Sequence, residues 1–475
     1  MLGNFVSGLG TQAALVALPY QVDVQTESAL LTGLLGAVEL GPLVAMALLG
    51  GALADRSDRR RLLLLDQIGL VAVAAALCGA ALSGEPHDDK EEALAAGSYD
   101  PPVSDLLSVR ALNRATLARQ LLLERADMTA LDAVEHLVGM QAQIPHDPYL
   151  GLWSRLASFD PAALGRLLVE RKVVRIVVMR GTIHLVSADD CLALRPLMQP
   201  VLDAELRRHP QSGPALEGVD VEPVLAYVRT LVAQAPRTGA QLRAAIAQRF
   251  SQHDAAALAY ACRNLLAFVQ VPPRGVWGQT MQVSSTTAEH WLGRPLAAAP
   301  SIDEVVVRYI AAFGPATVAD IASWSRLTGM RAVVERIAPR LRVFRDERGR
   351  ALYDLPDAPR PAADTPAPVR FLPEYDNVLL SHADRGRFYC AKQRGRLSAA
   401  PPRPIKGTVL VEGVVRATWR IDRGDDGAML LVDHAGAFAR HDAQAVETEG
   451  AGMLRFLEPE RAAAGGEVRL VRVDG

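Results

Sequence analysis

Apolar positions recur at helical spacing through most of residues 110–340 and change to β-branched runs nearer the C-terminus. Spacings of three and four residues predict amphipathic helices, and runs rich in Val, Ile and Thr predict strands. An apolar stripe over 112–122 predicts a first helix, and Thr129 stands where it would cap a second. Two more helices are predicted at 152–157 and 161–170, followed by a strand pair that Arg180 and Gly181 join.

The order of helix, helix, helix and two strands is predicted three times, which is the layout of a winged helix. Thr238 and Thr317 precede the second helices of the later copies and are predicted N-caps. The first copy has strands at 173–179 and 182–186. The second has helices at 221–234, 238–249 and 255–266 and strands at 268–271 and 276–280. The third has helices at 302–313, 317–327 and 330–340 and strands at 341–345 and 351–355.

The last quarter of the chain is predicted to be β-rich. Residues 360–368 have the composition of a linker. Beyond it lie predicted strands at 369–372, 407–411, 414–421, 429–432 and 467–473, with one helix at 442–450. The predicted fold class is α+β, with tandem winged-helix modules, a β-rich C-terminal module and an N-terminal hydrophobic helical segment. The predicted domains are 1–83, a linker at 84–108, winged-helix modules at 109–200, 201–300 and 301–360, and the β-rich module at 361–475.

The first 83 residues differ from the rest, because 29–54 and 62–82 are apolar runs long enough to span a bilayer. Residues 51–61 between them carry a Gly, an Asp-Arg pair and a basic run. This resembles the loop between the second and third helices of major facilitator superfamily transporters. The resemblance covers 83 of 475 residues, which excludes a working transporter. We expect a fusion or gene-model remnant, with a membrane anchor as the alternative, attached to a cytoplasmic body.

Charge and cysteine content narrow the function classes. The chain holds 51 basic and 53 acidic residues, but residues 101–475 hold 46 basic and 41 acidic ones, a net charge of +5. An arginine-rich cationic body fits a polyanion such as DNA. The arginines expected to bind DNA are Arg114, Arg119, Arg125, Arg155, Arg166, Arg171, Arg175 and Arg180. The four cysteines form no CxxC pair, and no metal site or Gly-rich nucleotide loop is evident, so no metal or cofactor is expected.

The segment 140–148 holds the strongest candidate chemistry. Gln141 and Gln143 are two residues apart, so they share a face on extended backbone but not on a helix. Pro145 favours extended backbone before it, and Gly139 is a plausible helix stop. Two carboxamides in one cleft can hold a water by donating and accepting hydrogen bonds. The alternative is that both are simply solvated in a loop.

Several motifs in the body occur in an order that resembles a known family. They are 110–123, the Gln141-Ala142-Gln143 triplet, 179–186, 372–380 and 384–387. Together they resemble the winged-helix DNA glycosylases of the azinomycin-resistance type (AlkZ-like and YcaQ-like) over about 109–475. The resemblance implies that Gln141 and Gln143 are catalytic and that the substrate is double-stranded DNA carrying N7-alkylated purines. It also implies the unhooking of interstrand crosslinks, as self-resistance to an alkylating natural product.

That activity suits two neutral amides. An N7-alkylguanine is already cationic and departs as a neutral base, so the remaining task is to orient a water toward the anomeric carbon. Gln143 is a candidate to stabilise the cationic sugar through its carbonyl oxygen. Near the motif the nearest lysine is Lys172, which favours a monofunctional glycosylase.

Other residues have two readings each. His146, with Asp147, is either a second candidate base or a turn feature, and His184 either lines the cleft or stays within the wing. Arg180 is a further candidate for the cleft, whereas Arg385 and Arg387 either meet phosphates or hold the β-rich module in place. The competing functions are a membrane-tethered winged-helix regulator without catalysis and a decayed transporter fusion. A monomer is expected.

Overall fold

The computed structural model describes residues 105–389, 406–424 and 427–473. The transporter-like segment 1–83 and most of the predicted linker lie outside the described residues. Within the described ranges, no helix is both long and apolar enough to cross a membrane. Residues 101–475 form one unit by their contacts, and every element below belongs to it.

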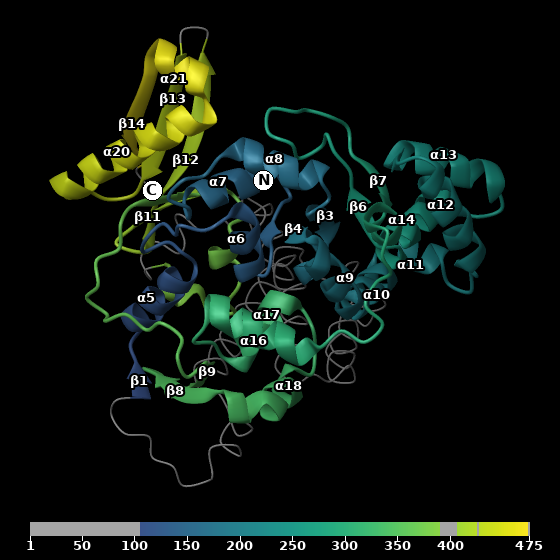
Figure 1. The fold of residues 1–475 in the computed structure, drawn as a ribbon, viewed down its shortest axis with the longest axis horizontal. Helices are drawn as coiled ribbons and strands as arrows, with labels where there is room; N and C mark the ends of the chain where they lie inside the picture. The colour runs from purple at the N-terminus through teal and green to yellow at the C-terminus, as the bar shows by residue number, and fades with distance from the viewer. Residues whose placement is uncertain (1–104, 390–405, 425–426, 474–475) are drawn as a thin grey trace, which may run out of the picture. The chain divides into compact units, whose positions relative to one another are not determined.

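The first group of elements follows the predicted order of helices and strands (Figure 1). Thr129 caps α6 as predicted, because its side chain accepts a hydrogen bond from the backbone N–H of Asp132. The helix predicted at 152–157 is wrong in position, since Pro148 in the first turn lets α7 begin at Asp147. The group comprises α5 (Val109–Arg119), α6 (Ala130–His136), α7 (Asp147–Trp153), α8 (Pro161–Val169), β3 (Val173–Val177) and β4 (Ile183–Ser187).

A six-stranded sheet joins this group to the next, in the order β2-β4-β3-β6-β7-β5. Strand β3 pairs antiparallel with β6, with Arg175 opposite Gln270. The sequence pattern predicts strand pairs but not their union in one sheet, because pairing between distant strands leaves no local signal. The remaining strands of this sheet are β2 (Met140–Gln141), β5 (Arg237–Thr238), β6 (Phe268–Gln270) and β7 (Ser284–Thr287).

The second group contains the three helices predicted for it, and Thr238 forms a complete capping box with Gln241. The strand predicted at 276–280 is wrong. Gly275 and Gly278 adopt positive φ angles of 89° and 74°, and the chain between them forms a loop, so that β7 begins only at Ser284. The helices are α12 (Glu222–Gln234), α13 (Gly239–Arg249) and α14 (Ala255–Leu265). Four others were not predicted: α9 (Ala188–Leu197), α10 (Gln199–Arg208), α11 (Ser212–Ala215) and α15 (Ala288–Leu292).

The third group packs around buried aromatic residues. Tyr309, Phe313 and Trp324 are each fully buried in its core. Thr317 caps α17 through a capping box with Asp320, as predicted for this threonine. Its elements are α16 (Ile302–Phe313), α17 (Val318–Ser325), α18 (Met330–Ile337), β8 (Arg342–Asp346) and β9 (Ala351–Asp354). A short strand β1 (Leu106–Leu107) adds in parallel to β8.

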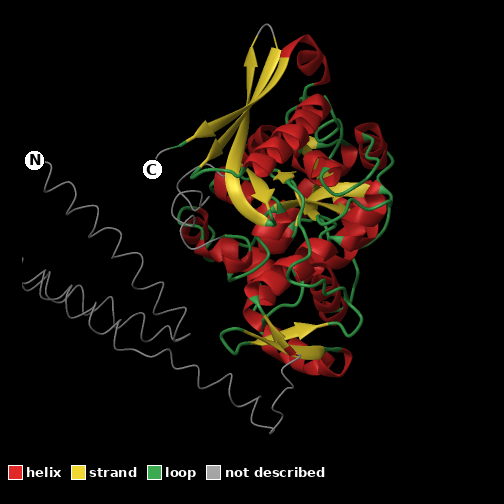
Figure 2. Ribbon diagram, turned by 90° about the vertical axis from the view of Figure 1, so that its left-hand side faces the viewer, coloured by secondary structure: helices red, strands yellow, loops and turns green. Residues whose placement is uncertain are grey.

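The C-terminal sheet is the region that the sequence predicts best. In Figure 2 its strands are visibly longer than those of the other sheets. All five predicted strands are present, in the order β10-β11-β12-β13-β14, with the last pair parallel. The predicted helix is longer than expected and a second helix follows it. The bounds are β10 (Arg370–Leu372), β11 (Gly407–Val411), β12 (Val414–Gly424), β13 (Gly427–His434), α20 (Arg440–Leu457), α21 (Pro459–Gly465) and β14 (Gly466–Arg472).

A buried ion pair attaches the segment after β10 to the first group. Arg155 donates from both terminal nitrogens to the two carboxylate oxygens of Asp376, at 2.8 and 2.7 Å. Their side chains are only 1% and 2% exposed, so the pair is bidentate and shielded from water. The segment that it holds contains two short 3-10 turns, η4 (Asn377–Leu379) and η5 (Arg385–Arg387).

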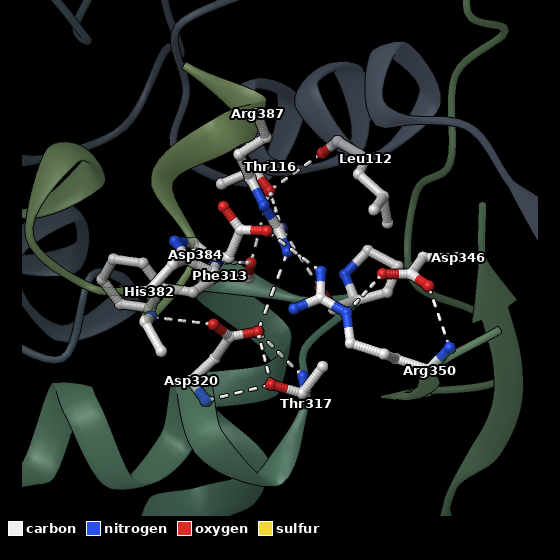
Figure 3. Close-up of polar contacts among 12 residues, drawn as sticks. Leu112, Thr116, Phe313, Thr317, Asp320, Asp346, Arg350, His382, Asp384 and Arg387 are labelled. Carbon is white, nitrogen blue, oxygen red and sulfur yellow. Dashed lines mark hydrogen bonds and ion pairs between the residues drawn. The ribbon is translucent and has the colours of Figure 1, made fainter. Parts of the chain in front are cut away.

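A second polar cluster holds the same segment at its other end (Figure 3). The carboxylate of Asp320 accepts a hydrogen bond from the backbone N–H of Ala383 at 2.9 Å. Arg387 donates to the hydroxyl of Thr116 at 2.9 Å and to the carbonyl oxygen of Pro315 at 3.2 Å. The segment 373–389 is thus fixed between α5, α7 and α17.

The ion pair between Arg155 and Asp376 should dominate local stability. Replacing Asp376→Asn keeps the side-chain shape but leaves a buried guanidinium without a counter-charge, which costs about 3–5 kcal/mol. Chemical denaturation should show this loss. The matched control is Asp189→Asn, whose pair with Arg294 is 78% and 52% exposed, and it should change stability by about 1 kcal/mol or less. Equal unfolding midpoints for the two variants would contradict the assignment.

Candidate active site

The glutamine segment is extended at Gln141, as predicted, but Gln143 lies in a bend that follows the strand. After α6 the chain passes through Gly139 at φ 89°, where a Cβ atom would approach Val186 Cγ1 to 2.7 Å. Only glycine tolerates both the angle and the contact. Strand β2 then pairs antiparallel with β4, with Gln141 opposite His184. The backbone N–H of Ala142 continues this pairing by donating to the carbonyl oxygen of Ile183 at 2.7 Å.

The amide oxygen of the Gln141 side chain is fixed by a hydrogen bond within the protein. Gln141 is 6% exposed, and its Oε1 accepts a hydrogen bond from Arg180 Nη2 at 2.8 Å. Its backbone N–H donates to the side-chain oxygen of Asn377 at 3.2 Å. With Oε1 engaged, the amide Nε2 is the group that Gln141 has left to offer as a donor.

The Gln143 side chain is exposed and differently held. Its Oε1 accepts a hydrogen bond from the backbone N–H of Ile183 at 3.1 Å. A carbonyl oxygen has two lone pairs, so one remains available to a ligand. Both glutamine side chains therefore lie beside the start of β4, one buried and one open to solvent.

Arg180 connects the parts of this site. Its Nη2 also lies 3.2 Å from His184 Nε2 and 3.3 Å from the side-chain oxygen of Asn377. Burial, and then the neighbouring Arg385, lower the pKa of Arg180 to about 10. Arg180 is therefore still charged at neutral pH, and its cluster of acceptors keeps the guanidinium against Gln141.

His184 is a positioning residue in this geometry. It is fully buried, and burial followed by the Arg180 charge lowers its pKa to about 3. The neutral ring fits its partners if Nδ1 donates to the carbonyl oxygen of Thr182, at 3.0 Å, and Nε2 accepts from Arg180. The structure thus places His184 behind Arg180, where it orients the guanidinium.

Asn377 is the site residue that sequence reasoning missed. Besides binding Gln141, its amide nitrogen donates to the carbonyl oxygen of Gly139 at 2.8 Å. Asn377 belongs to the motif 372–380, but 236 residues separate it from Gln141. Without coordinates, nothing in a motif of that kind indicates which backbone it bridges.

The residues after the glutamines carry unsatisfied polar atoms. His146 Nε2 and Asp147 Oδ2 are both buried without a hydrogen-bond partner. Burial above all, and then the nearby Glu374 and Asp376, raise the pKa of Asp147 to about 8. Burial lowers the pKa of His146. Asp147 is therefore largely protonated at neutral pH, which is unusual for a carboxyl group.

The two arginines of the 384–387 motif have different surroundings. Arg385 is exposed and lies close enough to Arg180 to lower its pKa. Arg387 is 7% exposed and occupied with Thr116 and Pro315 (Figure 3). The first is accessible to a phosphate, whereas the second is used within the protein.

Four of the arginines expected to bind DNA are sealed inside the protein, which corrects that prediction. They are each 1–2% exposed and pair with internal acceptors: Arg114, Arg119, Arg155 and Arg175. Arginine-rich composition does not distinguish a phosphate ligand from a buried ion-pair partner.

Among the described residues, no group of three or more His, Cys, Asp or Glu side chains is placed to hold a metal ion.

The comparisons with known proteins agree with the family expected from the motifs. Residues 134–456 match the family described as DNA glycosylase AlkZ-like, and this range contains all the site residues above. The solved DNA glycosylase AlkZ of Streptomyces sahachiroi is similar in fold, with a TM-score of 0.62 and 21% identity. The match covers 77% of this chain and 99% of that chain. No curated protein matches this chain.

The raised pKa of Asp147 has a testable consequence for stability. Because the folded protein holds its proton to about pH 8 while an unfolded Asp releases it near pH 4, folding takes up a proton between these values. This group's contribution is therefore present at low pH and lost as the pH rises toward 8. Asp147→Asn should unfold at a higher temperature than the parent at pH 8. The gap should narrow toward pH 4, by on the order of 1 kcal/mol per pH unit. A gap that does not change with pH would contradict the assignment.

Proposed function

This chain belongs to the AlkZ-like family of DNA glycosylases, and we propose that it hydrolyses the N-glycosidic bond of N7-alkylated purines in duplex DNA. The observation that carries the proposal is the pair Gln141 and Gln143, both of which are bound to the segment 180–183: Arg180 donates to Gln141 at 2.8 Å, and the backbone N–H of Ile183 donates to Gln143 at 3.1 Å. We include interstrand crosslinks between such purines among the substrates. A role in self-resistance to a DNA-alkylating natural product follows from that substrate class.

The two glutamines have distinct roles in this mechanism. The Nε2 of Gln141 donates to a water and orients it toward the anomeric carbon. The free lone pair of Gln143 Oε1 faces the sugar as positive charge develops there. The Arg180 guanidinium next to Gln141 makes that side unfavourable for a cationic sugar, so the exposed Gln143 is better suited to stabilise it. Orientation of the water supplies most of the effect, since the leaving base needs no proton.

Water, and not a lysine, is the proposed nucleophile. The lysines in the described part of the chain are Lys172 and Lys406. Lys172 is exposed after α8, and Lys406 pairs with Asp433 at 3.4 Å. An exposed amine and an amine held by a carboxylate are both poor candidates for the attacking group. We therefore propose a monofunctional glycosylase that leaves an abasic site.

A cluster of arginines beside the glutamines is the proposed contact for the phosphates of the damaged strand. Arg180, Arg326 and Arg385 come from three separate elements, and the charges of the other two lower the pKa of Arg180. Arg326 and Arg385 are exposed. Like charges gathered at a surface repel one another unless an anion joins them, and DNA phosphates supply that anion.

A second proposed contact is a groove of about 720 Å³ next to the six-stranded sheet. None of its described lining residues is acidic, and three of its five arginines are not buried: Arg237, Arg243 and Arg263. Helix α13 contributes Arg243. We propose that α12, α13, α14, β6 and β7 form a winged-helix module, one of three in tandem, and that this groove follows the duplex backbone.

The decisive experiment is release of free base from a duplex containing N7-methylguanine. The full-length chain should release 7-methylguanine, detected by liquid chromatography and mass spectrometry. Replacing Gln141→Ala or Gln143→Ala should each slow release by about 10²-fold or more, because water orientation is lost. The thermal unfolding temperature should stay close to that of the parent.

The matched control is Gln234→Ala, an exposed glutamine at the end of α12, which should release base at the parental rate. Parental rates in the double variant of Gln141 and Gln143 would refute the catalytic assignment. A parent that binds the duplex but releases no base would favour the non-catalytic regulator. Borohydride should trap no covalent DNA adduct at any stage of the reaction.

The phosphate contacts should appear in the salt dependence of duplex binding. Arg326→Ala and Arg385→Ala should each lower the slope of log K against log salt by about 1 and weaken binding to damaged and undamaged duplexes alike. The control is Arg336→Ala, because Arg336 is already paired with Asp303. An unchanged slope in the first two variants would place the phosphates elsewhere.

A further inference from the structure

A cavity of about 610 Å³ adjoins the glutamine segment and is not used by the mechanism above. It lies between the residues that follow Gln143, the loop between β6 and β7, strand β12 and the end of α20. Ile144, His146 and Asp147 come from the first of these, Trp277 from the loop and Trp419 from β12. Its volume is in the range of small-molecule sites.

Two of its walls are fixed aromatic rings. Trp277 packs with ring centroids 4.9 Å from Tyr149, 5.4 Å from His146 and 5.1 Å from Phe456. The Trp419 Nε1–H donates to the carbonyl oxygen of Leu372 at 2.8 Å. Because these rings are already fixed, a ligand does not have to order them when it binds. They offer a flat apolar surface on which a planar ligand can stack.

The floor of the cavity has polar atoms that the protein leaves unsatisfied. Asp147 is 8% exposed, and its Oδ2 has no hydrogen-bond partner. The neighbouring His146 Nε2 is likewise buried and unpaired. Buried polar atoms without partners are rare because each costs free energy, so two adjacent ones require an explanation. A ligand with hydrogen-bond donors on its edge would satisfy both.

Among the described lining residues, the acidic side chains without an ion pair are Asp147 and Glu374. The basic lining residues have acidic partners, since Lys406 and Arg420 pair with Asp433 and Arg423 pairs with Glu458. Glu374 lines the cavity without an ion pair to any described residue. A cation entering the cavity would therefore meet the unpaired carboxyl group of Glu374 beside the two indole rings, whereas the protonated Asp147 would offer a hydrogen bond and no charge.

The cavity also lies close to the proposed chemistry. Asp147 lines both the large cavity and a small void of about 10 Å³ that Gln141 shares. Ile144, on the cavity wall, directly follows Gln143. A base held in the cavity would thus place its glycosidic bond near the two carboxamides.

We infer that this cavity receives the alkylated purine itself, out of the base stack, and recognises it as a planar cation beside Trp277 and Trp419 through the charge of Glu374 and a hydrogen bond to Asp147. This inference rests on the proposed function. Glycosylases commonly read an extruded base by stacking and by hydrogen bonds to its edge. An unmodified purine is neutral and would gain the stacking but not the attraction to the Glu374 carboxylate. The room beyond a single purine accommodates a bulky alkyl group.

The test compares two nucleosides that differ in charge. Quenching of tryptophan fluorescence in the full-length chain should give a Kd for 7-methylguanosine, whose imidazole ring is positively charged, about tenfold lower than that for guanosine. The double variant Asp147→Asn with Glu374→Gln should bind the two nucleosides about equally. Asp422→Asn, an exposed carboxyl on β12, is the matched control and should keep the preference.

Excision kinetics separate this inference from the proposed function. The variants of Asp147 and Glu374 should raise KM for N7-methylguanine duplex while affinity for undamaged duplex stays at the parental value. The double variant of Gln141 and Gln143 should release no base and still prefer 7-methylguanosine. A parent that releases base but shows no nucleoside preference, or whose preference survives the carboxyl variants, overturns the inference and leaves the proposed function intact. A parent that prefers 7-methylguanosine without releasing base overturns the proposed function alone.

Discussion

The buried ion pair between Arg155 and Asp376 is the constraint on which the site depends. It joins the end of α7 to a segment 221 residues further along the chain, and it is shielded from water. The next residue, Asn377, then reaches Gly139 and Gln141. A charged pair is suited to this task because its bidentate geometry fixes both distance and orientation, whereas apolar packing tolerates sliding. The position of Gln141 therefore depends on contacts between two segments that are more than 200 residues apart in the sequence.

The chemistry of the site is built from groups that do not change charge near neutral pH. The glutamines are neutral, His184 is kept neutral by burial, and Arg180 keeps its charge despite a lowered pKa. A substrate that is already cationic needs orientation more than proton transfer, so a set of fixed dipoles is sufficient. In the proposed mechanism, two amides therefore take the place that carboxylates or histidines occupy in other hydrolases.

Asp147 is the exception, because its buried carboxyl group lowers the stability of the folded protein as the pH rises. A buried carboxyl group with an unpaired oxygen weakens the free protein as the pH rises. Such groups persist where a ligand compensates them, which is why unsatisfied polar atoms in a cavity carry information about what binds there. The neighbouring tryptophans give the same cavity a preference for flat guests.

The sequence by itself determined most of the local elements and indicated the family to which the chain belongs. The caps at Thr129, Thr238 and Thr317, the five C-terminal strands and the extended backbone at Gln141 all follow from spacing and side-chain type over a few residues. Only the tertiary structure decided which arginines are buried, that the strand pairs merge into one sheet, and that Asn377 and Asp147 belong to the site. Those outcomes depend on contacts between residues hundreds of positions apart, and a local pattern carries no signal of its distant partner.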